Sequence, residues 1–162
     1  MSEVLEIFRR NGNRHTLHYD EEDRHLVEAH RWYVAVQAHT CYAVYSQPGT
    51  GGRVKVRLHQ LIVPGCPQVD HVNGNGLDSR RANLRPATHQ QNMRNKRTQA
   101  RSEAGYKGVF SDGNGRWRAR IFCNGQRFNL GSYDTPEEAA LIYNAAAEKH
   151  FGEFAYLNVV PA

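Results

Sequence analysis

An Asp-His pair ends a short apolar segment in the middle of the chain. Asp70 and His71 are followed by Asn73-Gly74-Asn75-Gly76, residue types that tolerate the positive φ angles of tight turns. Asn83 and Asn92 come 12 and 21 residues after His71. Carboxylate and amide oxygens are ligands that Mg²⁺ and Mn²⁺ accept. Asp70 and Asn92 are therefore predicted to hold one divalent metal.

His71 is expected to do different chemistry from Asp70. Adjacent residues of a strand point to opposite faces, so His71 should lie beside the metal site rather than among its ligands. An imidazole has an ordinary pKa of about 6.5 and can take a proton from water near neutral pH. We therefore interpret His71 as a general base.

The sequence around these residues also predicts the strands and the helix that must position them. The pattern predicts a strand that ends at His71, a turn, a second strand after Asn83, and a helix over residues 88–97. This order would bring polar side chains from strand and helix together. The segment is also rich in cations that could contact phosphate, namely Arg80, Arg81, Arg85, Arg94, Lys96 and Arg97.

Residues Leu58 to Arg97 resemble the HNH endonuclease family, of the type found in phage and intron-encoded homing endonucleases. The likeness rests on Leu58-His59-Gln60-Leu61-Ile62, Val69-Asp70-His71-Val72-Asn73-Gly74-Asn75 and Asn83-Leu84-Arg85. It implies a ββα-metal (His-Me finger) fold that uses one Mg²⁺ or Mn²⁺ ion to hydrolyse a DNA phosphodiester.

The resemblance also implies roles for particular residues. His71 would be the general base, Asp70 and Asn92 would hold the metal, and Asn83 would orient the loop that carries the histidine. His89 is an alternative to Asn92 as a ligand. His59 recurs before the motif in the family, and we interpret it as structural or phosphate-contacting.

The C-terminal part has a second pattern, of strands and a capped helix. Residues 116–121 and 127–130 alternate in polarity around an Asn124-Gly125 hairpin turn. Thr135 and Glu138 form a predicted capping box, and the helix that follows has Ala139, Ile142, Tyr143, Ala146 and His150 on one face. We expect a small three-stranded antiparallel sheet packed on one helix, with Phe128 and Leu130 in the core.

One face of this predicted sheet is basic. The alternation places four arginines and an amide together, which suits phosphates and guanine edges in a major groove. Three further motifs accompany the arginine strand, namely Gly105-Tyr106-Lys107-Gly108-Val109, Glu137-Glu138-Ala139-Ala140 and Tyr156-Leu157-Asn158. With them, residues 105–158 resemble the Apetala-two/ERF-type DNA-binding domain of plant ethylene-response factors, with Phe110 and Asp112 where the plant domains have arginines. The candidate DNA contacts are Lys107, Arg116, Arg118, Arg120, Arg127 and Asn129, with Arg85, Arg94 and Arg97 from the nuclease motif.

Composition and charge agree with this organisation. The 162 residues carry a net charge of +5, which resolves into +4 over residues 58–104, +4 over 105–131, −4 over 132–162 and +1 over 1–57. No apolar run is long enough for a membrane span, and three cysteines far apart disfavour a disulfide framework.

Four segments are expected in an α+β fold. These are an N-terminal extension (1–57) with strands near 3–19, 32–37, 41–46 and 53–58, a nuclease motif (58–97), a linker (98–104) and a DNA-binding domain (105–160). Within the extension, Asp20 is predicted to cap a helix that ends near His30, and residues 48–52 to form a loop.

The sequence thus predicts a homing or nicking DNA endonuclease that acts on double-stranded DNA as a monomer or dimer. We expect no membrane contact and no small-molecule cofactor, and a cytoplasmic location, that of the host if the gene is phage-encoded. Two alternatives stay open: a non-cleaving transcriptional regulator of a phage or mobile element, and a nuclease specific for junctions or RNA.

Overall fold

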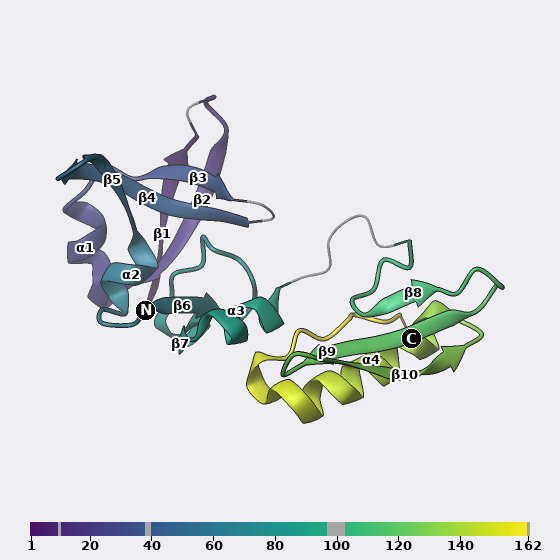
Figure 1. The fold of residues 1–162 in the computed structure, drawn as a ribbon. Coiled ribbons are helices and arrows are strands. Elements are labelled where there is room, and N and C mark those ends of the chain that lie inside the picture. The colour runs from purple at the N-terminus through teal and green to yellow at the C-terminus, as the bar shows by residue number, and fades with distance from the viewer. Residues whose placement is uncertain (10, 38–39, 97–102, 162) are drawn as a thin grey trace. The chain divides into compact units, whose positions relative to one another are not determined.

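The chain falls into two compact units, Met1–Asn92 and Met93–Ala162 (Figure 1). A computed structural model describes residues 1–9, 11–37, 40–96 and 103–161. Most of the expected linker, residues 98–102, lies outside the described residues. Within the described part of the chain, no helix is long and apolar enough to cross a lipid bilayer.

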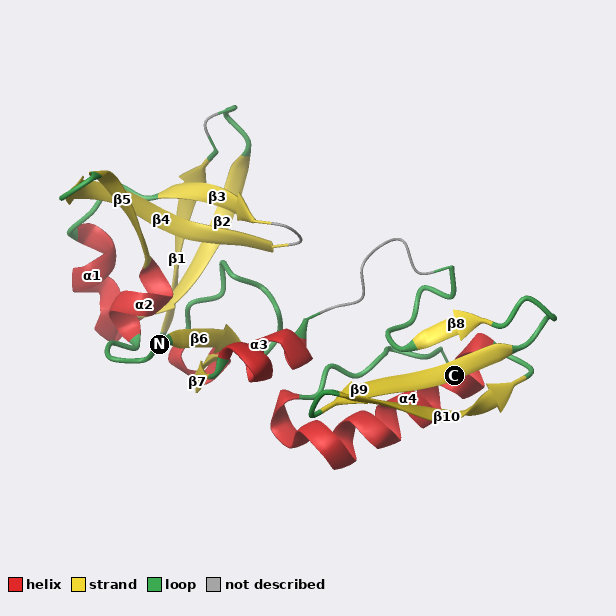
Figure 2. Ribbon diagram, in the orientation of Figure 1, coloured by secondary structure: helices red, strands yellow, loops and turns green. Residues whose placement is uncertain are grey.

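The first unit is built from short strands and helices in three small antiparallel sheets (Figure 2). The sheets pair β1 with β2, β4 with both β3 and β5, and β6 with β7. Its elements are β1 (Ser2–Phe8), β2 (Arg14–Asp20), the 3-10 turn η1 (Glu21–Asp23), α1 (Arg24–Glu28), β3 (Tyr33–Gln37), β4 (Thr40–Gly49), β5 (Gly52–Arg57), α2 (Leu58–Ile62), β6 (Gln68–His71), η2 (Arg81–Asn83), β7 (Leu84–Ala87) and α3 (His89–Asn95). The boundary between the two units falls within α3.

The predicted strands of the N-terminal extension are confirmed, but two details of the prediction are wrong. The predicted loop over residues 48–52 is shorter than expected, because β4 continues to Gly49 and β5 begins at Gly52, which leaves Thr50 and Gly51 as the turn. Pro48 is tolerated there because β3 pairs with β4 only as far as Val44, so that β4 has a neighbour on one side only at Pro48. The helix expected over 20–30 is instead η1 followed by the five-residue α1.

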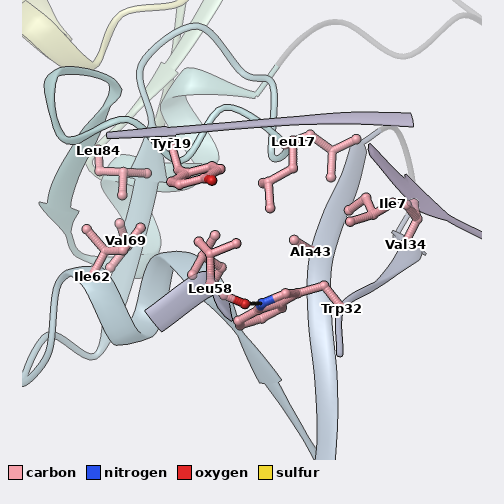
Figure 3. Packing of buried hydrophobic residues seen from close by; sticks show 12 residues of the cluster. Ile7, Leu17, Tyr19, Trp32, Val34, Ala43, Leu58, Ile62, Val69 and Leu84 are labelled. Atoms are coloured by element: carbon pink, nitrogen blue, oxygen red, sulfur yellow. Dashed lines mark hydrogen bonds between the residues drawn. The ribbon is translucent and has the colours of Figure 1, made fainter. Parts of the chain in front are cut away.

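One apolar cluster holds the extension and the predicted nuclease motif together (Figure 3). Leu17 of β2 and Leu58 of α2 are almost fully buried, and Val69 and Leu84 of the β6–β7 pair belong to the same cluster. The Trp32 indole donates a hydrogen bond to the Val27 carbonyl oxygen at 2.8 Å. Since burying such side chains is the main stabilising term in folding, residues 1–57 and the motif form one folded unit.

The second unit is a three-stranded antiparallel sheet packed on a helix, as predicted. Its strand order is β10-β9-β8, and Asn124 and Gly125 at the hairpin turn both have positive φ, 52° and 78°. Thr135 and Glu138 form the predicted capping box. The elements are β8 (Val109–Ser111), β9 (Trp117–Cys123), β10 (Gln126–Tyr133), α4 (Pro136–Phe151) and η3 (Gly152–Phe154).

The core of this unit differs from the expectation in two places. Phe128 lies on the helix side of the sheet but keeps 40% of its surface exposed, and its ring stacks on His150 at a centroid distance of 5.7 Å. The buried face of α4 is also rotated, because Ile142 is exposed to 39%. The residues that α4 buries are Ala139, Ala140, Tyr143, Ala147 and Phe151.

Gly108 is the tightest point of this packing. Its φ is +77°, and a Cβ atom there would lie 2.0 Å from the Tyr143 ring and 2.7 Å from the Arg120 carbonyl oxygen. We expect Gly108→Ala to lower the free energy of unfolding of the second unit by about 2–4 kcal/mol, because it adds a steric clash to the left-handed strain.

Urea unfolding followed by NMR signals of the second unit measures this loss. Gly113→Ala is the matched control, since Gly113 has a φ of +81° but no atom within 4 Å of the position that an added Cβ atom would take. The control should lose only about 1–2 kcal/mol. Equal losses in both variants would contradict the packing role of Gly108.

Candidate active site of the HNH region

The two residues of the Asp-His pair face opposite sides of β6, as their adjacency predicts. On one side the His71 ring lies against His59 of α2, with a centroid distance of 4.8 Å, and against Tyr42 of β4 at 5.8 Å. Tyr42 and His59 are themselves 5.3 Å apart. His71 therefore stands in a buried aromatic cluster built from three different elements.

Burial sets the charge state of the two histidines. It lowers the pKa of His71 to about 4, against the opposing charges of Asp70 and Asp78. It also lowers the pKa of His59 to about 3, with further lowering from His71 and Arg57. His71 is consequently a neutral imidazole at pH 7, the form that can accept a proton.

On the other side of β6, Asp70 is held by an arginine. The Arg85 Nε and Nη2 atoms donate to Asp70 Oδ2 at 2.9 and 2.7 Å. Arg85 is opposite Asp70 in the β6–β7 register, and both side chains are largely buried, with 12% and 4% of their surface exposed. Arg85, predicted as a DNA contact, thus has its guanidinium on a carboxylate of the site.

Asn92 of α3 lies over the same face of β6 as Asp70. Its Nδ2 donates to Gln68 Oε1 at 3.3 Å, and Gln68 precedes Asp70 by two residues on the strand. The alternative ligand His89 is also near Gln68, with its Nδ1 atom 3.1 Å from Gln68 Nε2. Helix α3 therefore places both candidates on the Asp70 side of the strand.

The donor chemistry of this face fits a hard divalent cation. Asp70 offers a buried carboxylate, and the Gln68 bond uses the nitrogen of the Asn92 amide rather than the oxygen that such a cation would bind. Among the residues that the structure describes, no three His, Cys, Asp or Glu side chains gather as a metal cluster. Asp70 and Asn92 would hold the metal as two of its ligands.

Asn83 organises the loop between β6 and η2. Its Oδ1 accepts a hydrogen bond from the Asn73 backbone N–H at 2.9 Å, and its Nδ2 donates to the Asp78 carbonyl oxygen at 2.7 Å. The Asn83 carbonyl oxygen accepts from the Val72 N–H at 2.9 Å. These three hydrogen bonds connect Asn83 to the loop that follows His71, and the orienting role of Asn83 stays a prediction.

Sequence reasoning missed the residues that anchor η2 from a distance. Arg81 donates from Nη2 to Asp23 Oδ1 at 2.7 Å, and its backbone N–H donates to Asp20 Oδ2 at the same distance. Asp23 is fully buried although 58 residues separate it from Arg81. The acidic run 20–23 is the predicted helix start, but the Asp20 side chain makes no such cap.

The basic face of the second unit has the predicted alternation. Arg118 and Arg127 are exposed, Arg120 is half-buried, and Asn129 is exposed opposite Arg120 in the β9–β10 register. Phe110 and Phe122 lie exposed among them, with the Arg120 guanidinium 5.6 Å from the Phe110 ring. The face is therefore cationic with apolar rings between the charges.

Three other predicted DNA contacts are placed differently, and a fourth is not described. Burial lowers the pKa of Lys107 to about 8, and its Nζ donates to backbone oxygens of the chain, including that of Lys96 at 2.7 Å. Arg116 pairs with Asp134 at 3.1 Å, and the Arg94 guanidinium lies 4.7 Å from the Phe151 ring. Arg97 lies outside the described residues.

The Asn83 hydrogen bonds should protect the loop after His71 from hydrogen exchange. Asn83→Ala should speed hydrogen exchange at the Asn73 amide by about tenfold, since removing the acceptor of a part-buried hydrogen bond costs about 1 kcal/mol. NMR hydrogen exchange on the free protein measures it. Asn75→Ala is the control, because its side chain is exposed and accepts from the nearby Leu77 N–H. Unchanged exchange in Asn83→Ala would refute the orienting role.

Known proteins resemble both parts of the chain. The HNH endonuclease family matches residues 63–94, and the AP2 domain family matches residues 104–153. An uncharacterized HNH endonuclease of Acanthamoeba polyphaga mimivirus is 34% identical over 143 residues, covering 83% of this chain and 70% of the relative.

Two further relatives each match a smaller share of the chain. Protein 3.8 of Escherichia phage T7 is 34% identical over 94 residues, covering 57% of this chain and 77% of that protein. The dehydration-responsive element-binding protein 2D of Arabidopsis thaliana is 35% identical over 86 residues, covering 52% of this chain and 42% of that protein. The chain belongs to the HNH endonuclease family, with an AP2 domain after its HNH region.

Proposed function

We propose that this nuclease is a divalent-metal-dependent DNA endonuclease of the homing or nicking type, with a ββα-metal site formed by β6, β7 and α3. The observation that carries the proposal is that the candidate base and the candidate metal ligands lie on opposite faces of β6. His71 lies neutral in an aromatic cluster on one face, whereas Asp70 and Asn92 share the other face. A base and a pair of hard oxygen donors are thus held on the two sides of one strand.

The residues suggest the following hydrolytic step. His71 takes a proton from a water molecule as the water oxygen forms a bond to phosphorus. The bond from phosphorus to the 3′ oxygen breaks, and the departing oxygen takes a proton from solvent water. The products are a 5′-phosphate and a 3′-hydroxyl end. A bound Mg²⁺ or Mn²⁺ ion would supply positive charge to the phosphate and the departing oxygen. Asn83 keeps the loop after His71 in place, and Arg85 fixes the orientation of Asp70.

The second unit would direct the enzyme to its DNA. Arg118, Arg120 and Arg127 present cations on one sheet face, and the acidic residues Glu137, Glu138 and Glu148 lie on α4. A twisted sheet of this size can enter a major groove and contact phosphates and base edges there. We infer that this face binds double-stranded DNA, whereas Lys107 and Arg116 act within the fold.

The catalytic proposal is tested with supercoiled plasmid in Mg²⁺, Mn²⁺ or EDTA. We expect conversion to open circle with either metal, none in EDTA, and a loss of at least about a hundredfold in rate for His71→Ala, because one positioned base contributes about 10²–10⁴-fold. DNA affinity should stay within about twofold. His25→Ala is the control, since His25 is exposed on α1. Nicking by His71→Ala at the parental rate would exclude His71 as the base, and no cleavage by the parent would favour a binding-only regulator.

The binding proposal is tested by gel shift at rising salt. Each cation that neutralises a phosphate contributes about 0.9 to the slope of log Kd against log salt, so Arg118→Ala should lower the slope by about 0.9 and the Arg118→Ala, Arg120→Ala pair by about 1.8. Lys149→Ala removes one exposed charge from α4 and should leave the slope unchanged. An equal change in all variants would mean that only the net charge matters.

A further inference from the structure

A long segment without Asp or Glu runs from the N-terminal extension into the HNH region. From Ala29 to Val69 there is no Asp or Glu, whereas Arg31, Arg53, Lys55 and Arg57 are present. Three of these cations fall on β5 at every second residue. Since alternate residues of a strand share a face, Arg53, Lys55 and Arg57 form one column on the β3–β4–β5 sheet.

The two faces of this sheet differ in character. Val34 and Ala43 on one face are buried in the core cluster of the unit. The face with the cations bears Tyr33, Gln37 and Ser46, and the Tyr33 hydroxyl is 2.8 Å from Ser46 Oγ. Arg53 and Lys55 are exposed, and the Arg57 Nη2 atom donates to Gln37 Oε1 at 3.2 Å. We call this surface, made by Tyr33, Gln37, Ser46, Arg53, Lys55 and Arg57, the outer sheet face.

The outer sheet face is continuous with the proposed active site. Tyr42 belongs to the same face, since it alternates with Ser46 along β4, and its ring contacts both Arg57, at 5.6 Å, and His71. Gly76 in the loop after His71 packs so closely on Tyr42 that a Cβ atom would lie 2.6 Å from the ring. Thr40, at the start of β4, accepts a hydrogen bond from the Gly76 N–H at 3.0 Å. The sheet and the catalytic loop are therefore joined by direct contacts.

We propose that the outer sheet face binds the phosphate backbone of duplex DNA next to the cleavage position. This inference rests on the proposed nuclease function. A cationic surface free of carboxylates, which runs into a site for phosphate hydrolysis, is complementary to a polyanion that already passes through that site. The column from Arg53 to Arg57 spans about 13 Å along the strand, or about four base-pair steps. The unit thereby extends the DNA footprint beyond the HNH region.

The test uses the full chain with Arg53→Gln and Lys55→Gln combined, which leaves Arg57 and the aromatic cluster intact. We expect the salt slope of DNA binding to fall by about 1.8 and the KM for duplex cleavage to rise on the order of tenfold. The kcat at saturating DNA should be unchanged, because neither side chain contacts His71. The melting temperature should stay within about 2 °C, since both substituted side chains are exposed.

The matched control is Arg14→Gln combined with Arg24→Gln. It removes the same number of charges from the same unit, but these arginines belong to β2 and α1, where they are ion-paired with Glu6 and Glu3. Its slope and KM should stay at the parental values. An equal fall in both double variants would overturn the proposal in favour of a long-range charge effect.

DNA length gives a second readout. Shortening the duplex in steps on either side of the cut should weaken binding of the parent over about four base pairs of one flank, and should have no such effect on Arg53→Gln, Lys55→Gln. A parent that cleaves DNA but shows no difference from this variant in slope, KM or flank length would refute the outer sheet face while leaving the nuclease function standing. A parent that neither binds nor cleaves DNA would refute both.

Discussion

The arrangement of the candidate site depends on how the loop between β6 and η2 satisfies its polar groups. This loop has little regular structure, yet several of its residues are buried, and a buried backbone group without a partner is costly. The Asn83 side chain accepts from one end of the loop and donates to a carbonyl within it, so that a single amide closes the segment.

Asp78 stabilises the same loop, since its carboxylate accepts hydrogen bonds from Asn73 Nδ2 and from the Arg80 guanidinium. The hydrogen bond from Arg80 holds the pKa of the Asp78 carboxyl below its ordinary value, against the effect of burial. Asp78 therefore stays ionised, the loop stays closed, and His71 is fixed at its start.

This closure is connected to residues far away in the chain. Arg81 at the start of η2 is bound by Asp20 and Asp23, and β2 contacts the loop through the His18 N–H, which donates to the Leu77 carbonyl oxygen at 2.9 Å. Because a buried carboxylate such as Asp23 is strongly destabilising without its partner, the extension and the HNH region constrain each other. Residues 1–57 are thus structural support for the proposed site, and the outer sheet face gives them a role in binding as well.

The second unit combines a small core on one face of its sheet with an exposed cationic surface on the other face. Its core is small, with four alanines and Tyr143 among the buried residues of the helix side, so close approach of backbone at Gly108 replaces large side chains. The sheet can then leave most of its other face to solvent, where arginines and two phenylalanines are exposed. A sheet surface with cations and apolar rings suits a DNA groove, which offers phosphates at its edges and methyl groups on its floor.

Interactions between residues close together in the sequence determined several elements of this fold. The turn residues after His71, the alternation around Asn124-Gly125 and the Thr135 capping box act within a few residues of each other, so the sequence by itself predicted β6, the β9–β10 hairpin and α4. It also predicted the opposite faces of Asp70 and His71, because adjacent strand residues always diverge. Tertiary structure alone decided which distant groups meet: Arg81 with Asp23, Arg85 with Asp70, and Tyr42 and His59 with His71. Such partners are chosen by burial and charge neutralisation across the whole fold, and a carboxylate read as a helix start cannot reveal the arginine 58 residues away that it binds.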